Sequence, residues 1–125
     1  MLLQSHSSSG PRRATGPAAG PVPAEAVLEH IPPQADVIVP MANGEPPGLL
    51  DVLDREYALL DGVRIHQMHA LHPRPSIDGT CGDHLRHVSY FLSPVTRPAY
   101  WAGHVDLVPN HFSEMPHLLR AATKC

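Results

Sequence analysis

The chain has 125 residues, a formal net charge of −3 with acidic and basic residues interspersed, and two cysteines, Cys81 and Cys125. This length allows one domain. The sequence has no basic stretch typical of a nucleic-acid binder, no apolar run near the ~18 residues of a membrane span, and no disulfide framework. We therefore expect a protein with no nucleic-acid or membrane partner, located in a reducing, cytoplasmic compartment.

Residues 1–24 consist mainly of serine, glycine, proline and alanine. Such a segment buries too little apolar surface to offset the entropy lost on ordering, so we predict a disordered leader. It lacks the apolar core of a secretory signal, and its prolines and glycines disfavour the amphipathic helix of a transit peptide. Residues 25–122 are then expected to form the domain, and residues 123–125 a short tail.

The rest of the chain alternates short apolar runs with amphipathic segments. In chain order we predict a helix over 24–31, a strand over 35–39, a turn over 40–44, a helix over 46–60 with its prolines in the first turn, a strand over 63–68, an irregular segment over 70–84, a strand over 87–92, a helix over 94–102 capped by Ser93, a strand over 105–108 and a helix opened by Ser113. Strands alternating with helices predict a parallel, two-sided α/β sheet.

The turn over 40–44 follows a predicted buried strand directly. Asn43 and Gly44 are residues that tolerate a positive φ, which suits a tight turn. Open α/β sheets bind ligands at the carboxyl ends of their strands, and the N-terminus of the following helix attracts anions. Pro46 and Pro47 remove two amide donors there, which weakens an interpretation as a phosphate site.

The run RIHQMHALH over residues 64–72 spaces three histidines evenly. On a strand, His66 and His69 would point to opposite faces, and on a helix His72 would lie about 240° from His66. Three ligands therefore do not converge on a tetrahedral ion, and no cysteine or carboxylate is placed to complete a site. We predict no metal site. The alternative, a metal-dependent enzyme that also uses His84 and His87, would carry stoichiometric zinc.

Cys81 lies among small residues in DGTCGDH, with His84 and His87 close in sequence. An exposed cysteine beside histidines can act as a nucleophile, but it needs a third group that orients the base. The sequence offers no such group, and a single cysteine is more often inert. We therefore disfavour a thiol enzyme.

Three stretches follow one another in the order seen in a known family. They are ADVIVPMANGEPPGLLDVL (35–53), VRIHQMH (63–69) and LRHVSYFLSPVTRPAYWAGHVDLVPNHFSEMPHLL (85–119). Taken together, residues 24–119 resemble the N-terminal portion of the acetyl-CoA hydrolase / acetate (4-hydroxybutyrate) CoA-transferase family. The resemblance implies an α/β fold of two similar halves with the active site between them, of which this chain would be a partial parallel-sheet domain.

The resemblance also implies a reaction, in acetate or acyl-CoA metabolism. CoA would move from an acyl-CoA to a small carboxylate, or to water in the hydrolase variant, with CoA as substrate and no bound cofactor. In the family a glutamate attacks the thioester and then carries CoA as a glutamyl-CoA thioester, so one acyl transfer becomes several easier steps. Backbone amides of a glycine-rich loop stabilise the oxyanion.

This chain departs from the family pattern in one respect. The nucleophilic glutamate and the glycine-rich loop belong to the second half of the family fold, and no glutamate here matches that motif. We therefore expect a truncated member that lacks catalytic residues and is inactive alone, forming homo-oligomers or pairing with a chain that supplies the C-terminal half. Exposed strand edges predict marginal stability for the isolated chain.

By position, Asn43, Gly44, Glu45 and Arg97 are the candidate substrate-binding residues. The alternatives are that Asn43 and Gly44 simply form a turn, and that Arg97 pairs with a neighbouring carboxylate. A second function also stays open, a non-catalytic assembly module that binds the missing half without acyl-CoA turnover. The sequence leaves the acyl group, the acceptor, and transfer versus hydrolysis undecided.

Overall fold

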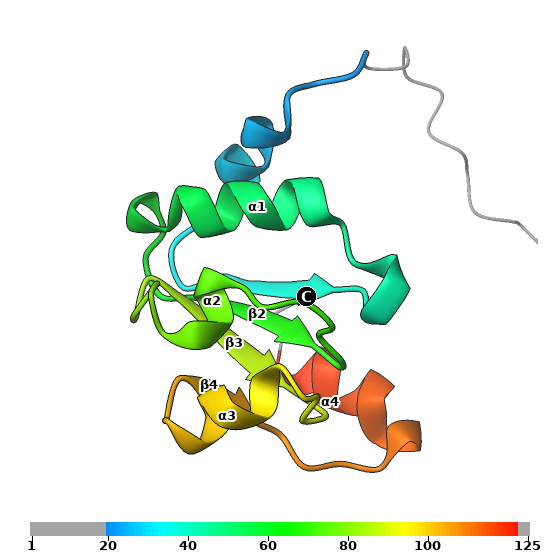
Figure 1. The fold of residues 1–125 in the computed structure, drawn as a ribbon. Helices are drawn as coiled ribbons and strands as arrows, with labels where there is room; N and C mark the ends of the chain where they lie inside the picture. The colour runs from blue at the N-terminus through cyan, green and yellow to red at the C-terminus, as the bar shows by residue number, and fades with distance from the viewer. Residues whose placement is uncertain (1–19, 123–125) are drawn as a thin grey trace, which may run out of the picture.

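The computed structural model of the chain describes residues 20–122, which form one four-stranded parallel sheet with helices on both faces (Figure 1). The strands lie side by side in chain order: β1 (Asp36–Val39), β2 (Val63–Gln67), β3 (Leu85–Ser89) and β4 (Val105–Leu107). This confirms the predicted parallel α/β architecture. The predicted leader lies outside the described residues except for 20–24, and so does the predicted tail.

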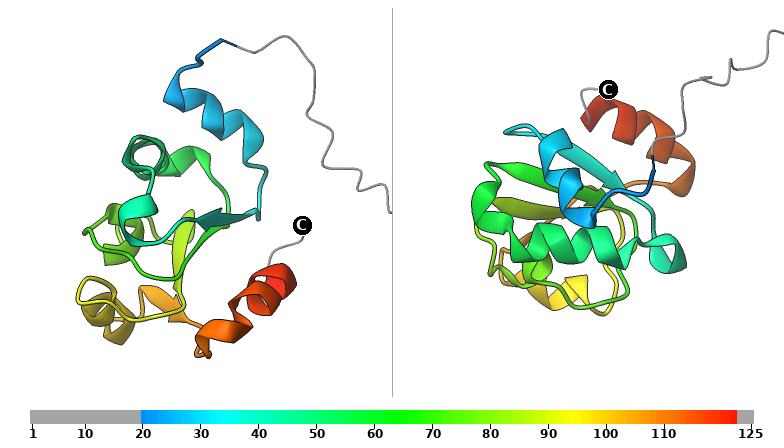
Figure 2. Two further views of the ribbon diagram at one scale, coloured as in Figure 1. Left: turned by 90° about the vertical axis from the view of Figure 1, so that its right-hand side faces the viewer. Right: turned by 90° about the horizontal axis from the view of Figure 1, so that it is seen from above.

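Each strand connection runs through a helix that returns the chain to the amino end of the sheet. The helices are η1 (Ala24–His30), η2 (Ala42–Gly44), α1 (Pro47–Arg55), η3 (Tyr57–Leu59), α2 (Pro75–Asp78), α3 (Thr96–Trp101), η4 (Phe112–Glu114) and α4 (Met115–Ala122), where η marks a 3-10 helix. Figure 2 shows α1, α2 and α3 on one face of the sheet and α4 on the other. No helix within residues 20–122 combines the length and the apolar character needed to cross a membrane.

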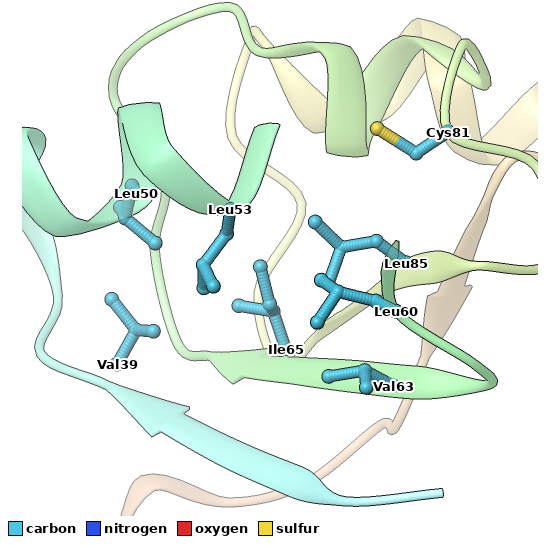
Figure 3. Packing of buried hydrophobic residues seen from close by; sticks show 8 residues of the cluster. All are labelled: Val39, Leu50, Leu53, Leu60, Val63, Ile65, Cys81 and Leu85. Atoms are coloured by element: carbon cyan, nitrogen blue, oxygen red, sulfur yellow. The ribbon is translucent and has the colours of Figure 1, made fainter. Parts of the chain in front are cut away.

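The main core lies between the sheet and α1 (Figure 3). Alternate residues of β2, Val63 and Ile65, point into it, because successive side chains of a strand face opposite sides. Burial of aliphatic side chains of this size contributes roughly 1.5–3 kcal/mol each. The core residues are Val39, Leu50, Leu53, Leu60, Val63, Ile65, Cys81 and Leu85.

Some element boundaries differ from the predictions. Residues 75–78, predicted to be irregular, form α2, which ends at Gly79 with a φ of 92°. The strand predicted over 87–92 begins at Leu85 and ends at Ser89, because pairing with β2 stops there. The C-terminal helical segment is capped by His111 rather than Ser113, because the His111 backbone N–H donates to Glu114 Oε2 at 2.9 Å.

Candidate functional site

The loops that follow the four strands meet at one edge of the sheet, which we call the carboxyl edge (residues 40–45, 68–72, 90–95 and 108–111). The Ala42 backbone N–H donates to the His69 carbonyl at 3.0 Å, and the rings of His69 and Phe91 lie 5.3 Å apart. Asn110 Nδ2 donates to the Tyr90 carbonyl at 2.9 Å. These contacts join all four loops into one surface, at the place where open α/β sheets bind ligands.

Glu45 lies at this edge with its carboxylate buried and hydrogen-bonded on both oxygens. Its Oε2 accepts from Gln67 Nε2 at 2.9 Å, and its Oε1 accepts from Arg74 Nε at 3.1 Å. Burial acts to raise the pKa of Glu45, but the hydrogen bonds from Gln67 and Arg74, with the charges of Arg74 and His72, together lower it below its usual value. Glu45 is therefore ionised and held in place at neutral pH.

Arg74 connects Glu45 to helix α1. Its Nη1 donates to Asp51 Oδ1 at 2.8 Å and to Asp54 Oδ2 at 3.0 Å. Burial disfavours the charged guanidinium, but hydrogen bonds to Asp51, Asp54 and Glu45 outweigh it and raise the pKa of Arg74. We call Glu45, Asp51, Asp54, Gln67 and Arg74 the Arg74 network. It fixes the 40–45 turn against α1 and the start of α2.

The other turn candidates, Asn43 and Gly44, lie exposed in η2. The positive φ predicted for them is found instead at Ala42, whose φ is 51°, so that prediction is wrong. A Cβ on Gly44 would lie 3.2 Å from Pro40 Cβ, and this close approach favours glycine there. An alanine in the left-handed region is strained, and such strain is concentrated at ligand-binding and active sites.

Arg97 lies exposed in the first turn of α3, beside the carboxyl edge. Its Nη2 donates to the Leu92 carbonyl at 3.3 Å. The ion pair considered as an alternative for Arg97 has no counterpart within residues 20–122. By contrast, a carboxylate lies within hydrogen-bond distance of Arg55, Arg64, Arg74 and Arg86.

A second buried polar chain crosses the other face of the sheet, toward α4. His66 Nε2 lies 2.9 Å from Asp36 Oδ1, and His66 Nδ1 lies 2.9 Å from the Tyr90 hydroxyl. Because a carboxylate only accepts, we assign the proton to Nε2, and the Tyr90 hydroxyl then donates to Nδ1. Burial raises the pKa of Tyr90, and the charge of Asp36 adds to this effect. The chain joins β1, β2 and the loop that begins at Tyr90.

Substituting Tyr90→Phe is expected to lower the free energy of unfolding by about 1–2 kcal/mol, because the buried Nδ1 of His66 loses its partner. The measurement is equilibrium urea unfolding. Tyr100→Phe is the matched control, since Tyr100 is only half-buried and forms a ring contact with Trp101. An equal change in the two variants would contradict a role for the Tyr90 hydroxyl.

His87 is the second buried histidine of the described residues, after His66, and lies on the α1 face of β3. Its side chain is 1 % exposed, and its Nε2 has no hydrogen-bond partner within the described chain. Burial lowers the pKa of His87 to about 4, with the charge of Glu45 opposing this shift and that of His66 adding to it. The imidazole is therefore neutral at physiological pH.

The three histidines of residues 64–72 diverge. His66 is buried against Asp36 and Tyr90, His69 contacts the Phe91 ring, and His72 is an exposed side chain 3.7 Å from Glu45 Oε1. Within residues 20–122 no three His, Cys, Asp or Glu side chains are grouped so as to hold a metal ion.

Cys81 is buried in the main core. Burial raises the pKa of its thiol to about 11, and the negative charges of Asp54 and Asp78 add to this effect. A thiol with this pKa is protonated at neutral pH, and the thiolate is the nucleophile of cysteine enzymes. The structure therefore argues against a thiol enzyme based on Cys81.

Sequence reasoning did not identify Gln67, Arg74 or Phe91 as residues of this edge. Arg74 is separated from Glu45 by 29 residues and from Asp54 by 20, so no local spacing pattern marks the network. Phe91 was placed inside a predicted strand. Gln67 ends a strand that also contains Arg64 and His66, so its polar side chain did not stand out in the sequence.

Comparison with known proteins gives partial matches. The chain is 37 % identical over 81 residues to a succinyl-CoA:cyclohexane-1-carboxylate CoA transferase from Geobacter metallireducens, which covers 65 % of this chain and 18 % of that protein. Two solved structures share the fold with a TM-score of 0.65: RipA from Yersinia pestis at 22 % identity and a RipA mutant at 23 %. Each match covers 78 % of this chain and 25 % of the RipA chain.

No protein-family model matches the chain. The chain spans less than a fifth of the length of the curated relative. The RipA structures establish a likeness of fold alone, and the sequence similarity concerns a CoA transferase. Together these comparisons support a relationship of the CoA-transferase type.

Proposed function

We propose that this chain forms one wall of the substrate site in an enzyme that moves CoA between an acyl-CoA and a carboxylate. The observation that carries this proposal is the 37 % identity to a CoA transferase over 81 residues, within a chain that folds as a parallel α/β sheet. Transfer is preferred to hydrolysis because the similar protein is named as a transferase.

The wall in this proposal is the carboxyl edge. The 40–45 turn brings Asn43 and Gly44 to the substrate, and the Arg74 network keeps that turn in one position. Arg97 supplies a positive charge that no carboxylate of residues 20–122 neutralises. Preorganised groups of this kind can orient a substrate before reaction, which lowers the entropic part of the barrier.

Glu45 is not the nucleophile in this proposal. Both its oxygens accept hydrogen bonds, from Gln67 and Arg74, and its side chain is only 4 % exposed. A carboxylate so occupied cannot approach a thioester carbon without first losing these bonds. We infer that CoA passes through a glutamyl-CoA thioester on a glutamate supplied by another half of the active site, as the family resemblance implies.

A chimera tests the proposal. The matched segment of the Geobacter transferase is replaced by the corresponding residues of this chain, and transfer from succinyl-CoA to cyclohexane-1-carboxylate is followed by chromatography. The proposal predicts product at a rate within about tenfold of the parent, a barrier change of ~1.4 kcal/mol. The parent with the same segment deleted is the control.

Three outcomes are informative. Formation of the new acyl-CoA supports transfer, and release of free CoA without it supports the hydrolase variant. A folded chimera with neither activity contradicts the proposed function. If the full chain then binds the remainder of the transferase without restoring turnover, the assembly-module alternative holds.

A further inference from the structure

The carboxyl edge exposes large apolar side chains. Phe91 is 55 % exposed, Met41 46 % and Leu71 38 %. They belong to the loops after β3, β1 and β2, which touch through the Ala42–His69 hydrogen bond and the His69–Phe91 ring contact. Single exposed apolar residues are ordinary, but a group of them on one edge indicates a binding surface.

The exposure of Phe91 is not the result of a loose loop. Ser89 Oγ donates to the Phe91 carbonyl at 2.8 Å. Farther along, Ser93 and Thr96, both with 0 % exposure, cap each other: the Ser93 N–H donates to Thr96 Oγ1 at 2.9 Å and the Thr96 N–H to Ser93 Oγ at 3.2 Å. Phe91 is therefore held by hydrogen bonds on either side along the chain, as expected of a preorganised contact residue.

Arg97 brings a positive charge to the loop that carries Phe91. Arg97 Nη2 reaches the carbonyl of Leu92, the residue after Phe91, which uses one of the five N–H donors of the guanidinium. The remaining donors face no carboxylate of residues 20–122. The Arg74 network places its negative charges toward α1, and Glu114 lies against the 108–111 loop at the start of α4, so an anion is favoured near Arg97.

We infer that the substrate class of the proposed site is carboxylic acids with a bulky apolar body. The body packs against the aromatic wall of Phe91 and His69, whose rings lie 5.3 Å apart at an interplanar angle of 43°, and the carboxylate binds Arg97. An arginine can bind a carboxylate through two parallel hydrogen bonds. This inference rests on the proposed function and makes Phe91 a specificity residue.

Titration of the full-length, isotope-labelled chain followed by NMR tests the inference. Cyclohexane-1-carboxylate is the probe that carries both the carboxylate and the apolar body. Acetate carries the carboxylate alone, and cyclohexylmethanol carries the apolar body alone. We expect saturable shifts in residues 68–72 and 90–97 with cyclohexane-1-carboxylate, and binding weaker by about tenfold or more for each of the other two probes.

Two substitutions separate the contribution of the apolar contact to binding from the contribution of the positive charge. Phe91→Ala should weaken binding of cyclohexane-1-carboxylate about tenfold and leave acetate unchanged, and Arg97→Gln should make the acid bind no better than the alcohol. Phe112→Ala and Arg120→Gln are matched controls, since Phe112 is 69 % exposed and Arg120 is exposed on α4. Amide spectra of all four variants show whether each is folded.

The inference is overturned if Phe91→Ala binds as Phe112→Ala does, or if cyclohexane-1-carboxylate shifts no residue of the carboxyl edge. The second readout is the preference of the active chimera for cyclohexane-1-carboxylate over acetate, which Phe91→Ala should reduce about tenfold. If Phe91→Ala leaves this preference of an active chimera unchanged, the proposed substrate class is refuted and the proposed function still stands. If the titration shows binding at the carboxyl edge but the chimera is inactive, the binding site is supported and CoA transfer is refuted.

Discussion

Replacing Arg74 with methionine is expected to lower the free energy of unfolding by about 3 kcal/mol, because removing one partner of a buried ion pair leaves an uncompensated charge. The substitution would leave the carboxylates of Glu45 and Asp54 without their cation, and these side chains are only 4 % and 7 % exposed. Asp51 adds little to the effect, because its side chain is 65 % exposed and its ion pair is screened by water.

Equilibrium urea unfolding at neutral pH measures the effect of Arg74→Met. The control is Arg55→Met, because Arg55 also contacts two carboxylates, Glu25 and Glu56, but with 53 % of its side chain exposed. Exposed pairs contribute little, so we expect a much smaller change for this control than for Arg74→Met. Equal losses in the two variants would show that the Arg74 network does not depend on burial.

The free energy of unfolding is expected to fall by about 3 kcal/mol as the pH is lowered from 7 to 4, because of His87. The unfolded histidine has a pKa of 6.5 and the folded one a pKa of about 4. Between these values the unfolded chain binds more protons than the folded chain, so stability rises with pH in this window and is lost on acidification. The difference between these two pKa values corresponds to about 3 kcal/mol.

Unfolding curves collected at intervals from pH 7 to pH 5 measure this slope before the carboxylates protonate. His87→Phe replaces the imidazole by an apolar ring and should flatten the slope, while raising stability near pH 5. His117→Phe is the control, since His117 is exposed on α4. If His87→Phe retains the slope of the parent chain, another group causes it.

The parallel sheet was predictable because short strand candidates alternate with helical segments, whereas no pattern in the sequence indicates the strand order β1-β2-β3-β4. The ends of the strands were less predictable. The run HVSYFL over 87–92 keeps aromatic and aliphatic residues to its end, and its pattern does not show that pairing stops at Ser89 and releases Phe91 to the surface. Pairing ends where the neighbouring strand β2 ends, which is a property of the sheet.

The sequence predicts a turn at the carboxyl edge, but it does not predict most of the contacts found there. A turn after the first strand indicates the carboxyl edge, because parallel strands end on the same side of a sheet. The residues that fix the turn, Gln67 and Arg74, are brought to Glu45 only by the fold. The strained residue was misassigned because asparagine and glycine favour a positive φ more than alanine does, and here tertiary contacts place it at Ala42.

The most direct test of the account compares two chimeric transferases, one carrying this chain's residues unchanged and one in which residues 41–44 are replaced by Ser-Gly-Ser-Gly, which keeps glycine at position 44 and places a glycine at the positive φ of position 42. Glu45 is retained in both, so the Arg74 network and the fold are preserved. If the carboxyl edge lines the substrate site, the first chimera transfers CoA and the second is slower by about 100-fold at equal stability. Equal rates in the two chimeras would contradict the account.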